Sequence, residues 1–497
     1  MNKKQRYSGI LMPISSLNGA DDVGTIGVEA FRFVDYLCDL GVGVWQILPL
    51  GRTDGFNSPY QCYSSYAGNE FYIDLAFLHG RGWLNECPLK QDYFASNGEI
   101  DWDGVKCNKS VFLQQAFEGF RYQNQFASDG YLAFWQEHQL WLEDYSLFMA
   151  LTQKYEGVTW SEWPEEIRDR VPNALAQAYN ELEEVVLYHR FVQYVFFLEW
   201  ELLHQYAMQR GVKIMGDLPL YVAFHSSDVW VHPNQFQLNS EYQMTEVGGV
   251  PPDDFNENGQ HWGSPLFDWD VMAADQYQWW RSRLSFQLKL YDLLRIDHFR
   301  GLESYYSIKS IYLDGKVGVW NDARGDEMLS LLPSVMHEKI IAEDLGLIDE
   351  KVRSLRDKYH FDGMGVFQFA FDGNVHNVHL PMHYSDTCCA YIGTHDNATL
   401  ISWYDELEIE QKKLMLEYIG VERLSFRAVA RNMMQSHARG VIFQMQDILA
   451  LGDEGRMNTP GTIDGNWIWR AKDKTLPIHD WLKKDIIRFA RSKEVLS

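Results

Sequence analysis

Eight short apolar runs recur along the chain and restrict its fold more than any other feature. They cover residues 10–14, 44–49, 212–216, 293–297, 340–344, 366–370, 389–394 and 441–446. Each has the length of a buried strand, and segments of helical periodicity lie between several of them. Eight alternating strand and helix units close a parallel (β/α)8 barrel, with right-handed crossovers and the helices outside. We therefore predict an α/β fold of this type.

Local signals favour this alternation of strands and helices. After the first run, the sequence predicts a helix that begins with Thr25 as its cap and ends at Gly41. Phe33 and Leu37 of this helix are expected to face the core. The alternative fold is an open doubly wound sheet. Neither a GxGxxG motif after the first strand nor a Walker-type loop is present, so the barrel is the favoured prediction.

Two intervals between the apolar runs are too long for simple crossovers. Residues 52–210 separate the second and third runs, and their helical patterning predicts a large, mostly helical subdomain inserted between strands 2 and 3. Residues 218–274 are rich in Pro, Gly, Asn and Trp, and we expect them to form long irregular loops over the C-terminal face of the barrel. The whole chain, 1–497, is interpreted as one catalytic barrel carrying both insertions.

Charge and cysteine content exclude several classes of partner. The formal net charge of −25 disfavours nucleic acid and anionic membranes. The most apolar helical segment, 191–200, is half the ~20 residues that span a bilayer and contains Gln193 and Glu199, so we expect a core helix. The six cysteines, among them Cys87, show neither zinc-site spacing nor a disulfide framework, which predicts a cytoplasmic protein without a metal.

Ionisable residues follow several of the predicted strands, and in a barrel these strand ends share one face. They are Asp217, Arg295, Asp297, Glu343, His395 and Asp396. Each alone has an ordinary structural explanation as an ion pair or a turn. Carboxylates from three different strands are costly to bury together unless their mutual repulsion serves a purpose, and catalytic groups of barrel enzymes gather at this face. Together the residues favour an active site.

Paired carboxyl groups of this kind suit retaining cleavage of a glycosidic bond. That reaction needs an ionised nucleophile and a protonated acid, about 5 to 5.5 Å apart. Arg295 lies two residues before Asp297, on the same side of its strand, and is expected to keep Asp297 charged. Glu343, crowded by other carboxylates, is expected to have a raised pKa. Asp297 is therefore the predicted nucleophile and Glu343 the predicted acid.

Several motifs resemble those of the amylomaltases, which are 4-α-glucanotransferases and are also called disproportionating enzymes. They are GDLP at 216–219, RIDHFRG at 295–301, AEDLG at 342–346, GTHDN at 393–397, SPYQ at 58–61, GVPPDDFNENGQHWGSPLFDW at 249–269 and RMNTPGTIDGNW at 456–467. The similarity extends from near the N-terminus to the end of the chain.

The resemblance implies roles for the individual residues. Asp297 is the nucleophile, Glu343 the general acid/base, and Asp396 grips and distorts the sugar in the transition state. Tyr60, Asp217, Arg295 and His395 complete the donor subsite. Trp262 is a further expected contact, through stacking of its ring on a pyranose face, with core filling as the alternative.

The activity implied by the resemblance is transfer of part of an α-1,4-glucan or maltooligosaccharide to the 4-hydroxyl of another glucan or glucose. No cofactor is required, because carboxylates and protons suffice for the chemistry. Two alternatives stay open at this point: a retaining α-glucan hydrolase that uses the same carboxylates, and a non-catalytic glucan-binding protein.

Overall fold

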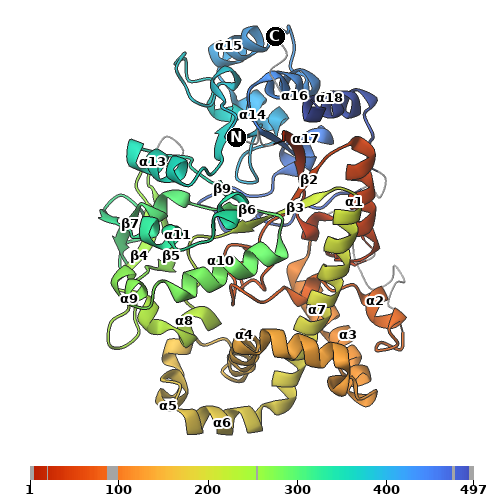
Figure 1. Ribbon diagram of the computed structural model, residues 1–497, viewed down its shortest axis with the longest axis vertical. Helices are drawn as coiled ribbons and strands as arrows, with labels where there is room; N and C mark the ends of the chain where they lie inside the picture. Colours follow the sequence, from red (N-terminus) through yellow and green to blue (C-terminus); the bar gives the residue numbers. More distant parts are fainter. Residues whose placement is uncertain (1–4, 20, 87–98, 253–255, 473–475, 492–497) are drawn as a thin grey trace.

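Eight parallel strands form the central sheet in the computed structural model of the chain, which describes residues 5–19, 21–86, 99–252, 256–472 and 476–491 (Figure 1). The strands are β1 (Tyr7–Leu11), β2 (Val44–Gln46), β3 (Lys213–Leu218), β6 (Leu293–Ile296), β9 (Ile340–Ala342), β10 (Gly363–Val366), β11 (Cys388–Tyr391) and β12 (Gly440–Gln444). Their order is β10-β11-β12-β1-β2-β3-β6-β9. A parallel bridge between Ile341 and Asp362 brings the two ends of this order together. The predicted (β/α)8 barrel is confirmed.

The predicted strands all exist, although two of them lie further along the sequence than the real ones. Instead of 10–14, β1 covers 7–11, and instead of 366–370, β10 covers 363–366. Both real strands contain glycines that a search for apolar residues passes over. A Cβ atom on Gly9 would lie 2.4 Å from Cδ1 of Ile442, so a larger residue here would require the Ile442 side chain to shift.

Apolar side chains from the strands fill the barrel interior. The cluster contains Leu11, Val44, Met215, Leu293, Ile341, Met364, Val366, Cys389, Tyr391 and Ile442. Because the interior is packed rather than hollow, a ligand has access only to the ends of the barrel.

Helices surround the barrel and follow most of its strands (Figure 1). They are α1 (Val28–Leu40), α8 (Ser227–Val231), α9 (Trp269–Ala274), α10 (Gln278–Leu290), α11 (Gly325–Ser330), α12 (Ser334–His337), α13 (Glu350–Lys358), α14 (Leu400–Glu406), α15 (Ile409–Ile419), α16 (Phe426–Gln435), α17 (Met445–Ile448) and α18 (Asp480–Arg491). Helix α1 buries Phe33 and Leu37 and ends at Gly41, as predicted, with Gly41 in the left-handed region at φ 79°. The predicted cap at Thr25 is wrong, because the residue before the helix is Gly27.

Between β2 and β3 the described chain is mostly helical. It contains α2 (Leu75–Gly80), α3 (Trp102–Tyr122), α4 (Asp129–Lys154), α5 (Glu165–Arg168), α6 (Pro172–Glu181) and α7 (Glu183–Gln209). In Figure 1, α3 to α6 gather below the barrel. The apolar segment 191–200 lies inside α7 with Gln193 and Glu199 buried. No helix among the described residues has the length and apolarity needed to cross a membrane. The division at 52–210 into a separate subdomain stays a prediction.

A second, antiparallel sheet lies to one side of the barrel. Its order is β5-β4-β7-β8, from β4 (Glu246–Val250), β5 (Gln260–Pro265), β7 (Ser304–Lys309) and β8 (Val319–Asp322). Strands β4 and β5 fall inside 218–274, where we expected irregular loops. The pairing of β4 with β7, far along the sequence, gives no local signal, and Gly248 and Gly249 interrupt the apolar pattern of β4.

Candidate active site

One open pocket of about 740 Å³ lies at the carboxyl ends of the barrel strands. Six of the eight predicted site residues line it: Tyr60, Trp262, Arg295, Asp297, Glu343 and Asp396. The other two, Asp217 and His395, are buried beside it, with 2% and 1% of their surfaces exposed. Residues far apart in the sequence meet here because parallel strands deliver their C-terminal ends to the same rim.

Arg295 joins two of the predicted carboxylates. Its Nη1 donates to both oxygens of Asp217, at 2.8 and 2.6 Å, and its Nη2 donates to Oδ1 of Asp297 at 2.8 Å. The three side chains come from the ends of the neighbouring strands β3 and β6. One buried guanidinium therefore supplies positive charge to two carboxylates, which would otherwise repel each other.

Tyr60 connects this group to His395. Its hydroxyl lies 2.6 Å from Oδ2 of Asp217 and 2.8 Å from Nε2 of His395. A tyrosine has one proton to donate, and Asp217 accepts it, so Nε2 of His395 carries the hydrogen that the Tyr60 oxygen accepts. Burial lowers the pKa of His395, which keeps the imidazole neutral near pH 7. The hydrogen bonds therefore indicate the neutral tautomer of His395 that carries its proton on Nε2.

Two backbone amides hold Glu343. The N–H of His298 donates to Oε2 at 2.6 Å, and the N–H of Leu345 donates to Oε1 at 3.0 Å. His298 adopts a left-handed conformation, with φ 51°, directly after Asp297, and this turn aims its amide at Glu343. Glu343 is therefore fixed through the same turn that carries Asp297.

Burial raises the pKa of both Asp297 and Glu343. At Asp297 the neighbouring charges of Asp217, Glu343 and Asp396 add to the rise, and Arg295 opposes it. The raised pKa of Glu343 agrees with the sequence reasoning, but its first cause is burial rather than crowding by carboxylates. The rise at Asp297 was not expected from the sequence. Of these two carboxyls, only Asp297 contacts the guanidinium directly. The rise in the pKa of Glu343 is opposed by the same cation and by the two backbone N–H groups that it accepts.

Asp396 lines the pocket next to His395, with 39% of its side chain exposed. The Nδ2 of Asn458 donates to its Oδ1 at 2.6 Å, and Nε2 of His395 lies 3.4 Å from its Oδ2. Asn458 is absent from the residues predicted from the sequence. It belongs to the quoted motif at 456–467, which was the only sequence signal for it.

Comparison with known proteins agrees with the geometry of the site. The profile of the family described as 4-alpha-glucanotransferase matches residues 12–476. The chain belongs to the 4-alpha-glucanotransferase family. This confirms the resemblance and the class of enzyme predicted from the sequence motifs.

Relatives in the 4-alpha-glucanotransferase family match nearly the whole chain. The 4-alpha-glucanotransferase of Synechocystis sp. is 40% identical over 486 residues, covering 96% of each chain. That of Thermus thermophilus is 40% identical over 476 residues, covering 94% of each. The solved amylomaltase from Streptococcus agalactiae in complex with acarbose superposes with a TM-score of 0.92 at 34% identity, covering 98% of this chain and 99% of that one.

Trp262 reaches the pocket from β5 of the second sheet. Its Nε1 donates to Oε1 of Gln260 at 3.0 Å, and its ring meets that of His298 edge-on at 4.7 Å between centroids. The indole is thus oriented by two neighbours while it still lines the pocket. In the described part of the chain, no three His, Cys, Asp or Glu side chains gather as a metal site requires.

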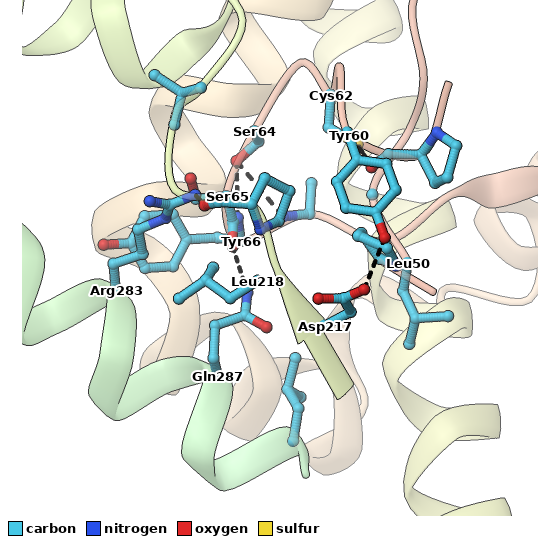
Figure 2. A pocket seen from close by; sticks show the side chains of 18 of the residues that line it. Leu50, Tyr60, Cys62, Ser64, Ser65, Tyr66, Asp217, Leu218, Arg283 and Gln287 are labelled. Carbon is cyan, nitrogen blue, oxygen red and sulfur yellow. Dashed lines mark hydrogen bonds between the residues drawn. The ribbon is translucent and has the colours of Figure 1, made fainter. Parts of the chain in front are cut away.

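A second, much smaller cavity of about 50 Å³ lies beside Tyr60 and Asp217 (Figure 2). Figure 2 shows the hydrogen bond from Tyr60 to Asp217 at one edge, with Arg283 and Gln287 of α10 at the other. Its volume suits a few water molecules and not a sugar ring. A sugar ring of a glucan therefore does not fit this cavity.

Proposed function

We propose that the chain transfers a segment of an α-1,4-glucan to the 4-hydroxyl of another glucan or of glucose, with retention of configuration, through an ester on Asp297. The observation that carries this proposal is that Asp297 and Glu343 line one pocket while the guanidinium of Arg295 contacts only the first of them. This arrangement supplies the ionised nucleophile and the protonated acid that a retaining mechanism needs.

In the first half of the reaction, Glu343 gives its proton to the glycosidic oxygen while Asp297 attacks the anomeric carbon. Arg295 occupies Oδ1 of Asp297, which leaves Oδ2 as the attacking atom. The bond from the anomeric carbon to the glycosidic oxygen breaks, the fragment with the free reducing end leaves, and a glucosyl ester remains.

In the second half, Glu343 is ionised and removes the proton from the 4-hydroxyl of an acceptor. The acceptor oxygen attacks the anomeric carbon, the ester bond breaks, and Asp297 is released as a carboxylate. Two inversions restore the α configuration. Asp396, which Asn458 holds at the pocket, binds the hydroxyls of the sugar as it distorts.

We also propose that residues 218–274 are the active-site loop region. Support comes from the pocket wall, which includes Leu220, Tyr221, Val250 and Gln260 from this segment. A cytoplasmic location is part of the same proposal. The five cysteines that the structure describes are free thiols, and Cys87 lies outside the described residues.

Incubation with maltotriose tests the function. Transfer predicts glucose together with maltooligosaccharides longer than the substrate, whereas hydrolysis predicts more reducing ends and no longer products. No reaction would favour a protein that only binds glucans. Asp297→Asn and Glu343→Gln should each lose activity by several orders of magnitude. Asp39→Asn and Glu338→Gln, at exposed positions, are matched controls that should keep wild-type rates.

A further inference from the structure

Trp320 is a large aromatic residue that stays partly exposed at the pocket. It lies in β8, the edge strand of the second sheet, with 36% of its surface exposed, and lines the same pocket as Asp297 and Glu343. Its indole N–H donates no hydrogen bond to any of the described residues. It therefore offers the pocket both an apolar ring and a free donor.

Arg300 and Tyr306 hold the indole in place. The guanidinium carbon of Arg300 lies 4.0 Å from the centre of the ring, and the ring of Tyr306 packs at 5.2 Å. Arg300 is itself anchored, because it donates to the carbonyl of Leu347 and lies 3.3 Å from Oδ2 of Asp349. A ring fixed from two sides loses little freedom when a ligand binds it.

The anchors of Trp320 place it on the Glu343 side of the site. Arg300 follows two residues after His298, whose amide holds Glu343, and Leu347 follows four residues after Glu343. Around the barrel, β3 carries Asp217, β6 leads to Asp297, and β9 leads to Glu343. Tyr60 contacts Asp217, on the far side of Asp297, and links it to His395. The donor residues and Trp320 thus flank the two catalytic carboxyls.

We propose that Trp320 binds a glucose unit of the leaving or acceptor glucan, by packing its ring on the sugar and donating its N–H to a hydroxyl. This rests on the proposed function, in which Glu343 protonates the bridging oxygen, so the sugars beyond that oxygen lie on the Glu343 side. A neutral sugar with apolar C–H faces and hydroxyl acceptors matches the two features that the indole presents.

The test separates formation of the ester from its transfer. With α-maltosyl fluoride as donor, the first-turnover release of fluoride reports attack by Asp297 and needs no acceptor. Rates with increasing maltotriose then give the acceptor KM. Trp320→Ala and Trp320→Phe are compared with Val319→Ala, an exposed control on the same strand. Phenylalanine keeps one aromatic ring but loses the N–H donor and part of the stacking area of the indole.

For Trp320→Ala we expect an acceptor KM about tenfold higher and a larger share of the ester passed to water, with the fluoride burst within about twofold of wild type. The acceptor KM of Trp320→Phe should lie between those of wild type and Trp320→Ala. An unchanged acceptor KM, or a burst that falls as much as transfer does, would overturn the role of Trp320. A wild-type protein that transfers no glucan would instead overturn the proposed function, and this role with it.

Discussion

The guanidinium of Arg295 donates a 2.8 Å hydrogen bond to Oδ1 of Asp297. Both side chains come from one strand end, two residues apart, and the arginine is 3% exposed. Burial alone would protonate Asp297, and this contact opposes it. The strength of the nucleophile therefore depends on a cation that does not itself touch the reacting carbon.

Replacing Arg295 should move the acidic limb of the pH profile. Arg295 lowers the pKa of Asp297, so in Arg295→Met that pKa rises and the ionised nucleophile is lost at a higher pH. We expect the acidic limb of kcat/KM to shift upward, with a rate loss of about 100-fold or more. Arg295→Lys keeps a positive charge and should shift the acidic limb less than Arg295→Met does. A limb that stays in place in Arg295→Met would contradict this role.

Removing the Tyr60 hydroxyl should weaken catalysis more than folding. Tyr60→Phe deletes hydrogen bonds to Asp217 and His395. Hydrogen bonds to charged groups contribute about 1.5–3 kcal/mol, which predicts a loss of about 10- to 100-fold in kcat/KM. Steady-state kinetics with maltotriose measure it, and thermal unfolding serves as the control. A change within twofold would show that Tyr60 does not organise the donor side.

Asn458 should act through Asp396. Its 2.6 Å hydrogen bond fixes a carboxylate whose side chain is 39% exposed, so Asn458→Ala is expected to lower kcat by about tenfold or more. Asn458→Asp replaces the donor with a second carboxylate that repels Asp396, so it should lower kcat at least as much as Asn458→Ala. The exposed Asn234→Ala is the control. A kcat within twofold of wild type in both Asn458 variants would argue against this coupling.

Asp447 should make stability depend on pH. Its buried carboxyl accepts the N–H of Leu400 at 2.7 Å, and burial raises its pKa to about 7. The unfolded chain ionises this group near pH 4 while the folded protein keeps the proton, so folding stability is lost as pH rises toward 7. Asp447→Asn removes that loss. The free energy of unfolding of the variant, relative to that of wild type, should therefore increase by roughly 2 to 3 kcal/mol from pH 5 to pH 8. A Tm difference that is equal at both pH values would contradict the raised pKa.

The sequence predicts the strand ends well because their chemistry is local. Asp217, Asp297 and Glu343 each follow an apolar run, and the parallel arrangement brings such ends together without further information. The same reasoning misplaces β1 and β10, where glycines replace apolar residues in the strand. It also gives no strands in 218–274, because β4 pairs with β7 more than fifty residues later.

Residues from loops are harder to predict. Tyr60 follows no strand and reaches Asp217 across 157 residues, and Asn458 reaches Asp396 across 62. Motif resemblance identified Tyr60, whereas no periodicity or spacing marks either residue. The raised pKa of Asp297 was missed for a related reason, since burial is a property of the folded pocket and not of the segment that carries the carboxyl.

The ester on Asp297 can be trapped directly. Glu343→Gln lacks the base for the second half of the reaction, yet fluoride needs no acid to leave, so α-maltosyl fluoride should load the variant and the ester should accumulate. Mass spectrometry of the digested protein should show one added maltosyl unit on the peptide that contains Asp297, and none in Asp297→Asn. A maltosyl unit on another carboxylate, or turnover of Glu343→Gln at the wild-type rate without any adduct, would contradict the mechanism.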